Sequence, residues 1–367
     1  MSDSWRILDP SRRGGKTGLA SVLAALIIVL TGNSVFAAPP SALTSINLQA
    51  SAWTVIAQQK GIFKEEFDKI GVREVKLIAA GAAELLGAET AAVAGGAIAV
   101  AQRMIYPATV HRANGLDNVL IWVSEPSNHY RTPVLAKASN DALKSVADLD
   151  GKKLGSARAS CYWAAPFEIL DKAGLPLDTR NRKGRVRYET IDNPTVMISS
   201  LLSGATDATA AHLAANQFTG AWLSGQFKII GSPPDDGVYV NHSGRVTYLA
   251  NRGFVEKYPE VIKAFLIAHE RTRSWATDHT NEAAEIIAKE LREPVEAALF
   301  QITHLGQWDF MGGEPDAEKA VNSIKAFQTW YVEHGDDILG DRKLTDEQIN
   351  AFVAKQFFSG GKYSIYQ

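Results

Sequence analysis

The fold class is decided by residues 145–174, SVADLDGKKLGSARASCYWAAPFEILDKAG. Residues 149–154 lead into a strand-to-helix turn at 156–161, and a helix over 164–173 ends at Gly174. We also expect strands at 46–50, 75–78, 118–123, 133–136, 186–188 and 227–230, helices at 53–60, 83–94 and 196–202, and almost continuous helix over 259–357. Strands that alternate with helices predict an α/β fold, with a mostly parallel sheet flanked by helices.

Residues 1–37 have the pattern of a secretory signal peptide. Arg12, Arg13 and Lys16 form a positive segment before the apolar run LASVLAALIIVL at 19–30, and small side chains at Val35 and Ala37 suit a signal peptidase. The run is shorter than the roughly 20 residues that span a bilayer, so we expect cleavage near Ala38 rather than an uncleaved anchor. Since Cys161 is the single cysteine, no lipoprotein cleavage site is present. We therefore expect a periplasmic protein, with the general secretory and twin-arginine routes both open.

Composition excludes several classes of function. The remaining chain of roughly 330 residues exceeds what one hydrophobic core usually serves, so two domains are expected. A net charge of -2 and a pI near 6.5 give no basic face for nucleic acid. One cysteine allows no internal disulfide, and the eight histidines have no metal-ligand spacing. We expect neither a metal nor a cofactor.

Four turns rich in small and hydroxyl side chains are candidate ligand contacts, at 50–54, 79–84, 157–162 and 192–195. In open α/β sheets, ligands bind beyond the carboxyl ends of strands, where helix N-termini offer backbone N–H groups to anions. Each turn taken alone is equally compatible with a tight connection that has no ligand. Four of them in one α/β chain favour an anion site.

Several segments resemble the solute-binding proteins of ABC importers in the sulfonate, taurine and nitrate class. The likeness is carried by WTVIAQQKGIFK at 53–64, SVADLDGKKLG at 145–155, MISSLLSGATDA at 197–208 and FVEKYPEVIKAFL at 254–266. These proteins have the type 2 periplasmic binding fold and are related to thiamine-pyrimidine synthase-like proteins. The resemblance covers nearly the whole mature chain.

The resemblance implies two lobes, each a mostly parallel sheet flanked by helices, with the chain crossing between them near 130–133 and 241–249. Lobe 1 would comprise 45–132 and 246–335, lobe 2 would comprise 133–245, and 336–367 would form a helical C-terminal extension. A small organic anion would bind in the cleft and draw the lobes together. The implied partners are this ligand and the permease subunits of the inner membrane, and we expect a monomer.

Candidate ligand contacts come from the four turns and one further position: Trp53, Thr54, Gly81, Ala82, Arg158, Ser160, Cys161, Asn193 and His212. Trp53 is a candidate for stacking on a ligand or for packing within its own lobe. Arg158 is a candidate for pairing with an anion, although a solvated arginine has the same sequence pattern. Ser160 suits a helix N-cap with or without a ligand. Arg131 is a weaker candidate.

The turn at 157–163 departs from the Gly-Ser-Ser/Thr run of many relatives, and Ala99 stands where an aspartate is common. Arg158, Tyr162 and Trp163 are bulkier and more polar than a minimal sulfonate pocket needs. They disfavour a small alkanesulfonate or taurine as the ligand and are compatible with an aromatic sulfonate or carboxylate.

Cys161 carries a rival hypothesis. Relatives of this fold include a desulfinase with a cysteine nucleophile, and a thiol at a helix N-terminus can be nucleophilic. That nucleophile lies in the first strand-to-helix turn, where residues 48–53 contain no cysteine, and the cysteine cluster of the synthases is absent. We therefore expect a binding protein and no enzyme. A desulfinase-like enzyme and a periplasmic ligand sensor are the alternatives.

Overall fold

The computed structural model describes residues 43–79, 89–127, 132–178, 184–213, 216–304 and 310–366. The chain divides into two compact units, 1–38 and 39–367, and all the described residues belong to the second. The expected signal peptide lies outside the described residues and stays a prediction. Within the described ranges, no helix combines the length and the apolar character that a membrane crossing requires.

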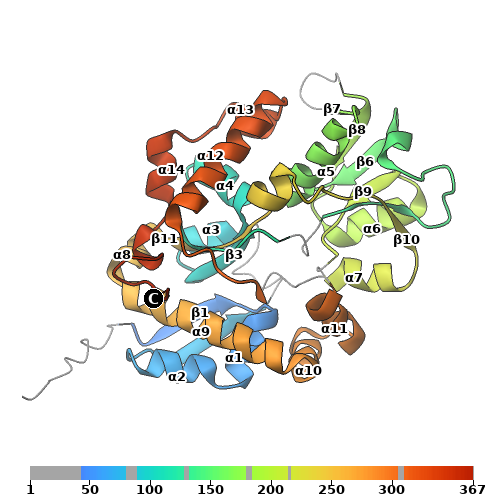
Figure 1. Ribbon diagram of the computed structural model, residues 1–367. Helices are drawn as coiled ribbons and strands as arrows, with labels where there is room; N and C mark the ends of the chain where they lie inside the picture. The colour runs from blue at the N-terminus through green and yellow to red at the C-terminus, as the bar shows by residue number, and fades with distance from the viewer. Residues whose placement is uncertain are drawn as a thin grey trace, which may run out of the picture. The chain divides into compact units, whose positions relative to one another are not determined.

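A six-stranded sheet is formed by the chain between 134 and 231 (Figure 1). Its strands are β5 (Val134–Lys137), β6 (Lys153–Ser156), β7 (Leu177–Asp178), β8 (Val186–Thr190), β9 (Ala208–Ala210) and β10 (Phe227–Gly231), in the spatial order β10-β5-β9-β6-β8-β7. Helix α5 (Cys161–Lys172) covers one face, while α6 (Pro194–Ser203) and α7 (Asn216–Leu223) cover the other. The alternation of β5 reflects this, because Val134 and Ala136 pack with α5 while Leu135 packs with α6 and α7.

Two smaller sheets are formed by the remaining strands. Strands β1 (Ser45–Gln49) and β2 (Glu74–Ile78) pair in parallel, and β11 (Val246–Asn251) lies between β3 (Val100–Met104) and β4 (Asn118–Val123). Side chains alternate along β11, since Leu249 packs into one core cluster while Tyr248 and Ala250 pack into another. Both faces of this sheet are therefore covered.

The helices around these two sheets are α1 (Ala52–Gln59), α2 (Ile62–Asp68), α3 (Glu89–Ala94), α4 (Ile105–Ala113), α8 (Arg252–Lys257), α9 (Pro259–Asp278), α10 (Thr280–Leu291), α11 (Val295–His304), α12 (Ala317–Glu333), α13 (Asp337–Gly340) and α14 (Asp346–Phe352).

The α/β fold with sheets flanked by helices is confirmed. Among the described strands, the β1–β2 sheet is parallel, the six-stranded sheet has three parallel and two antiparallel pairings, and the three-stranded sheet is antiparallel. Strand β11 runs antiparallel to both of its neighbours, and β5 runs antiparallel to β9 and β10. The pairings of β6 with β8 and β9 are parallel, as the alternation of strand and helix predicts. The physical reason is topological. After β4 the chain first forms the whole six-stranded sheet, and β11 then pairs between β3 and β4 in the direction opposite to both.

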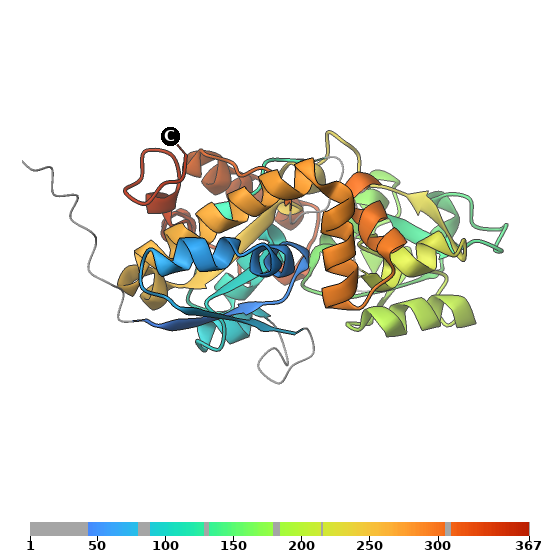
Figure 2. The same cartoon turned by 90° about the horizontal axis from the view of Figure 1, so that it is seen from below.

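Helices far apart in sequence link the sheets. Tyr331 of α12 donates a hydrogen bond to the Ala164 carbonyl of α5 at 3.0 Å, and Tyr106 of α4 donates to Asp336 just beyond α12 at 2.6 Å. On another side, α11 packs against α7, where Gln301 donates to Thr219 at 3.0 Å; Figure 2 shows this region from below. The end of the chain is part of the same packing, since Leu339, Ile349 and Phe352 are buried in the core cluster that contains α4 and α5. The exact boundaries of the expected lobes stay predictions.

Candidate functional site

The N-terminus of α5 brings two of the predicted contacts together. The Cys161 thiol contacts Nε2 of His212, a residue that follows β9. On the other side of that ring, His212 Nδ1 lies 2.7 Å from the Thr132 hydroxyl, which lies 2.7 Å from the Tyr239 hydroxyl. The Tyr162 ring packs against the His212 ring, with centroids 4.3 Å apart. All four side chains are buried. They form a row of polar contacts inside the protein, in the order Cys161, His212, Thr132 and Tyr239.

Arg103 on β3 lies within electrostatic range of this helix N-terminus. Burial raises the pKa of the Cys161 thiol and of the Tyr162 hydroxyl, and the positive charge of Arg103 opposes the rise in both. The Arg103 guanidinium forms an ion pair with Glu89, the first residue of α3. Its Nε atom is buried and has no hydrogen-bond partner among the described residues. Sequence reasoning missed Arg103, because no motif distinguishes a single arginine on a strand.

The first strand-to-helix turn is held by its own capping box. The Ser51 N–H donates to the Thr54 hydroxyl at 2.7 Å, and the Thr54 N–H donates back to the Ser51 hydroxyl at 3.5 Å. Trp53 is 2% exposed and packs edge-on against Phe265 and His269, at 5.1 and 4.8 Å between centroids. The adjoining cavity has only about 20 Å³, the size of one water molecule. The Trp53 ring is thus enclosed by its own core in this structure, and its stacking on a ligand stays a prediction.

The remaining predicted side chains have partners within the protein. Arg158 Nη2 donates to both carboxylate oxygens of Asp337, at 2.7 and 2.6 Å. Ser160 accepts from the Tyr162 N–H at 3.1 Å and caps α5. Asn193 accepts from two backbone N–H groups at the start of α6. Their roles toward a ligand stay predictions.

Gly81, Ala82 and Arg131 lie outside the described residues. The other predicted contacts fall into separate groups. Cys161 and His212 touch each other, Ser160 precedes Cys161 in the chain, and Trp53 and Thr54 are buried residues of α1.

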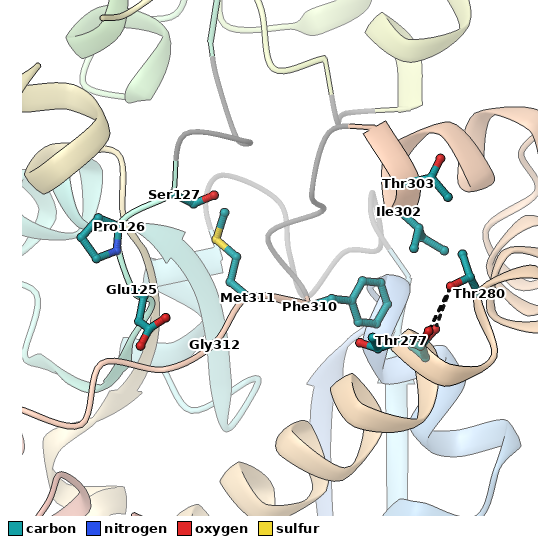
Figure 3. Close-up of a pocket in the computed structure, with 11 residues that line it drawn as sticks. Glu125, Pro126, Ser127, Thr277, Thr280, Ile302, Thr303, Phe310, Met311 and Gly312 are labelled. Atoms are coloured by element: carbon teal, nitrogen blue, oxygen red, sulfur yellow. Dashed lines mark hydrogen bonds between the residues drawn. The ribbon is translucent and has the colours of Figure 1, made fainter. Parts of the chain in front are cut away.

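A cavity of about 420 Å³ opens elsewhere, where the chain leaves β4 and passes the ends of α9, α10 and α11. Figure 3 shows Glu125, Pro126 and Ser127 on one side, Thr277, Thr280, Ile302 and Thr303 on the other, and Phe310 and Met311 between them. Its described lining offers apolar surface, hydroxyls and one carboxylate, enough for a small organic molecule. None of these residues was among the predicted contacts, because they come from four distant segments with no shared motif.

Residues 50–283 match the family model described as NMT1/THI5 like. The chain belongs to this family. Among curated proteins, none matches the sequence.

Solved structures similar to this NMT1/THI5-like chain share its fold. The periplasmic aliphatic sulphonate binding protein SsuA from Escherichia coli has a TM-score of 0.64 at 19% identity, with 83% of this chain and 97% of that chain covered. The alkanesulfonate-binding protein SsuA from Xanthomonas axonopodis pv. citri, bound to MOPS, has 0.64 at 17%, with 81% and 94% covered. The periplasmic nitrate-binding protein NrtA from Synechocystis PCC 6803 has 0.55 at 13%, with 85% and 88% covered. The chain therefore has the periplasmic-binding-protein fold.

In this NMT1/THI5-like chain, Cys161 and His212 are the residue types of a nucleophile and its general base. Their protonation states differ from those of an activated pair. Burial raises the pKa of Cys161 to about 12 and lowers the pKa of His212 to about 3. At neutral pH the pair is a thiol and a neutral imidazole, whereas an activated cysteine requires a thiolate. Within the described ranges, no group of three or more histidine, cysteine or acidic side chains could hold a metal ion.

Proposed function

We propose that this protein is the periplasmic substrate-binding component of an ABC importer. It captures a small organic anion of the sulfonate-like class, in which we include aromatic sulfonates and carboxylates, by hinge closure. It then delivers the ligand to permease subunits in the inner membrane, and it performs no chemistry itself.

One observation carries the proposal: the positive charge of Arg103 acts on the Cys161 thiol and the Tyr162 hydroxyl, both in the first turn of α5, so Arg103 lies within electrostatic range of that helix N-terminus. A guanidinium pairs well with a sulfonate or carboxylate, and a helix N-terminus carries partial positive charge. Arg103 belongs to the three-stranded sheet, while α5 packs on the six-stranded sheet. An anion that contacts both would stabilise the arrangement in which they are close, which is the requirement for ligand-dependent closure.

Family and fold support the same proposal. The solved structures with this fold include proteins described as binding aliphatic sulphonate, alkanesulfonate and nitrate. All three are anions. At this level of identity the likeness supports the anion class and leaves the individual ligand to experiment.

The Cys161–His212 contact favours a second candidate, a cysteine-dependent enzyme on the same fold. The neutral state of both groups argues against it, because burial raises the pKa of the Cys161 thiol to about 12 and so disfavours the thiolate at neutral pH.

A thermal-shift screen of sulfonates, aromatic carboxylates, nitrate and pyrimidines tests the proposal. A ligand at 100 times its dissociation constant adds about 2.7 kcal/mol to the free energy of unfolding. Arg103→Gln should abolish the shift, whereas Arg185→Gln, which removes an exposed arginine paired with Asp150, should leave it unchanged. Stabilisation by neutral pyrimidines alone, or a shift that survives Arg103→Gln, would refute the anion site. Consumption of a ligand by the wild type but not by Cys161→Ser would establish the enzyme instead.

A further inference from the structure

Helices α7 and α11 are neighbours in space but belong to different hydrophobic clusters (Figure 1). Helix α7 packs through Phe218 into the cluster that contains Met197 and Leu201 of α6. Helix α11 packs through Ala298 into the cluster formed with α1 and α10. As far as the described residues define them, these two clusters have no member in common. The contact between α7 and α11 is therefore not part of a shared apolar core.

The contact between α5 and α12 is of the other kind. Tyr106 of α4, Phe167 of α5 and Tyr331 of α12 are all buried in one continuous cluster. The Tyr331 ring lies 5.2 Å from the Tyr106 ring and 5.6 Å from the Phe167 ring, measured between centroids. Separating these helices would expose packed apolar surface, whereas separating α7 from α11 would not divide a common core. A rigid-body motion of the two sheets therefore opens most easily between α7 and α11.

A buried hydrogen bond joins α7 to α11. Gln301 Nε2 donates to the Thr219 hydroxyl at 3.0 Å, and both side chains are 0% exposed. The Thr219 hydroxyl in turn donates to the Leu213 carbonyl, so it is held in place to accept from Gln301. While the helices touch, an amide that lost this acceptor would be buried without a replacement, and water could satisfy it only after the helices part.

Both helices also border the candidate ligand surfaces. Ile302 and Thr303 directly follow Gln301 on α11 and line the cavity of about 420 Å³ (Figure 3). On α7, the Phe218 ring lies 6.3 Å from the ring of Tyr162, in the first turn of α5. A separation of α7 from α11 would therefore move one wall of the cavity relative to the proposed anion site.

We propose that the hydrogen bond between Gln301 and Thr219 locks the closed form of the protein, in which α7 contacts α11. The continuous cluster of α4, α5 and α12 is the side about which the protein opens. Gln301 is then a positioning residue: it holds the cavity wall in place and need not touch the ligand. This inference rests on the proposed function, since it names the contact that secures the proposed closure.

Distances between spin labels, measured by electron paramagnetic resonance without ligand, test the lock. Labels at Ser199→Cys on α6 and Glu285→Cys on α10, both exposed positions, report the separation of the two bodies in a Cys161→Ser background. Wild type should give mainly the short distance of the closed form. Thr219→Val, which removes the acceptor and preserves the shape, should raise the ratio of open to closed protein roughly fivefold to hundredfold.

The double variant Thr219→Val/Gln301→Leu gives the sharper result. It replaces both partners by apolar side chains of similar shape, so no amide is left unsatisfied in the closed form. Its ratio of open to closed protein should return to within about threefold of wild type, although it contains one substitution more than Thr219→Val.

Thr272→Val is the matched control. Its hydroxyl is equally buried but bonds within α9, to the Ala268 carbonyl at 2.7 Å, so the label distances should not change. Circular dichroism of every variant should match wild type. Wild-type distances in Thr219→Val, an open form that persists in the double variant, or a wild type without the short distance would overturn the lock. Failure of every compound in the anion screen would overturn the proposed function, and the ligand-free distances would still decide the lock.

Discussion

Arg158 and Asp337 form an ion pair between the turn before α5 and the start of α13, with one guanidinium nitrogen donating to both carboxylate oxygens at 2.7 and 2.6 Å. The guanidinium also lies 5.1 Å from the centre of the Trp163 ring. Arg158 was predicted as an anion contact, and in the folded chain its charge is compensated by Asp337, 179 residues further along the sequence. Any ligand that uses Arg158 has to compete with Asp337.

Two substitutions separate these roles of Arg158. Arg158→Ala and Asp337→Asn both break the pair, and each should lower the free energy of unfolding by at most about 1 kcal/mol because the arginine is partly exposed. If Arg158 binds the ligand, Arg158→Ala should weaken binding by about 1.5–3 kcal/mol, while Asp337→Asn should preserve or tighten it. Calorimetric titration of both variants decides the matter. Equal affinities in the two variants would assign Arg158 a purely structural role.

Cys161 should be unreactive in the native protein. Burial raises its pKa from 9.0 to about 12, so the thiolate fraction near neutral pH is about a thousandfold lower than for an ordinary thiol. Labelling with iodoacetamide at pH 7.5 should therefore be slow in buffer and fast in denaturant. Since Cys161 is the single cysteine, the unfolded chain is its own control. Rapid labelling of the native protein would revive the enzyme hypothesis.

Acid should destabilise the protein through His212 and His269. Burial lowers the pKa of both from 6.5 to about 3, so between these values the unfolded chain binds protons that the folded chain does not. Their contribution to stability is complete above pH 6.5 and is lost as the pH falls toward 3, with a slope of about 1.4 kcal/mol per pH unit for each histidine.

Denaturant unfolding at pH 7 and pH 5 measures that slope. Burial raises the pKa of Glu293 to about 7, so between pH 4.5 and 7 the folded chain binds more protons at this residue than the unfolded chain does. The contribution of Glu293 to stability therefore rises as the pH falls, opposite to that of the histidines. For this reason the comparison must be made between wild type and single variants. His212→Gln and His269→Gln should each reduce the loss of stability between the two pH values. If the pH dependence is unchanged in both variants, folding does not lower the pKa of either histidine, and the prediction is wrong.

Trp53→Ala should lower the free energy of unfolding by about 3–5 kcal/mol, because the indole is enclosed among Phe63, Tyr248, Phe265 and His269. Trp53→Phe retains much of this packing and serves as the matched variant for binding. A larger loss of affinity for aromatic than for aliphatic ligands in Trp53→Phe would support the predicted stacking. Equal losses would leave Trp53 as a core residue only.

Local sequence patterns predicted most elements of the fold. The strand expected at 118–123 is β4, and the helix expected at 53–60 is α1, shifted by one residue. The helix expected from 164 begins three residues earlier, which places Cys161 on its first turn. Strand β3 and helix α4 were missed, because Val100–Met104 lacks a clear period-2 pattern and joins directly to a helix. Arg103 lies on β3 and Tyr106 lies on α4. Because β3 was not predicted, Arg103, the cation of the proposed site, was not identified from the sequence.

The sequence by itself determined the α/β class, the family resemblance and the polar turns at helix N-termini, since these depend on residue spacing along one segment. Tertiary structure alone decided which polar side chains meet: Asp337 with Arg158, Glu89 with Arg103, and His212 with Cys161. It also decided that β5 and β11 run antiparallel, and that Trp53 is enclosed. The physical reason is that periodicity records which face of an element is buried, whereas partners across the fold depend on how the chain returns to its sheets.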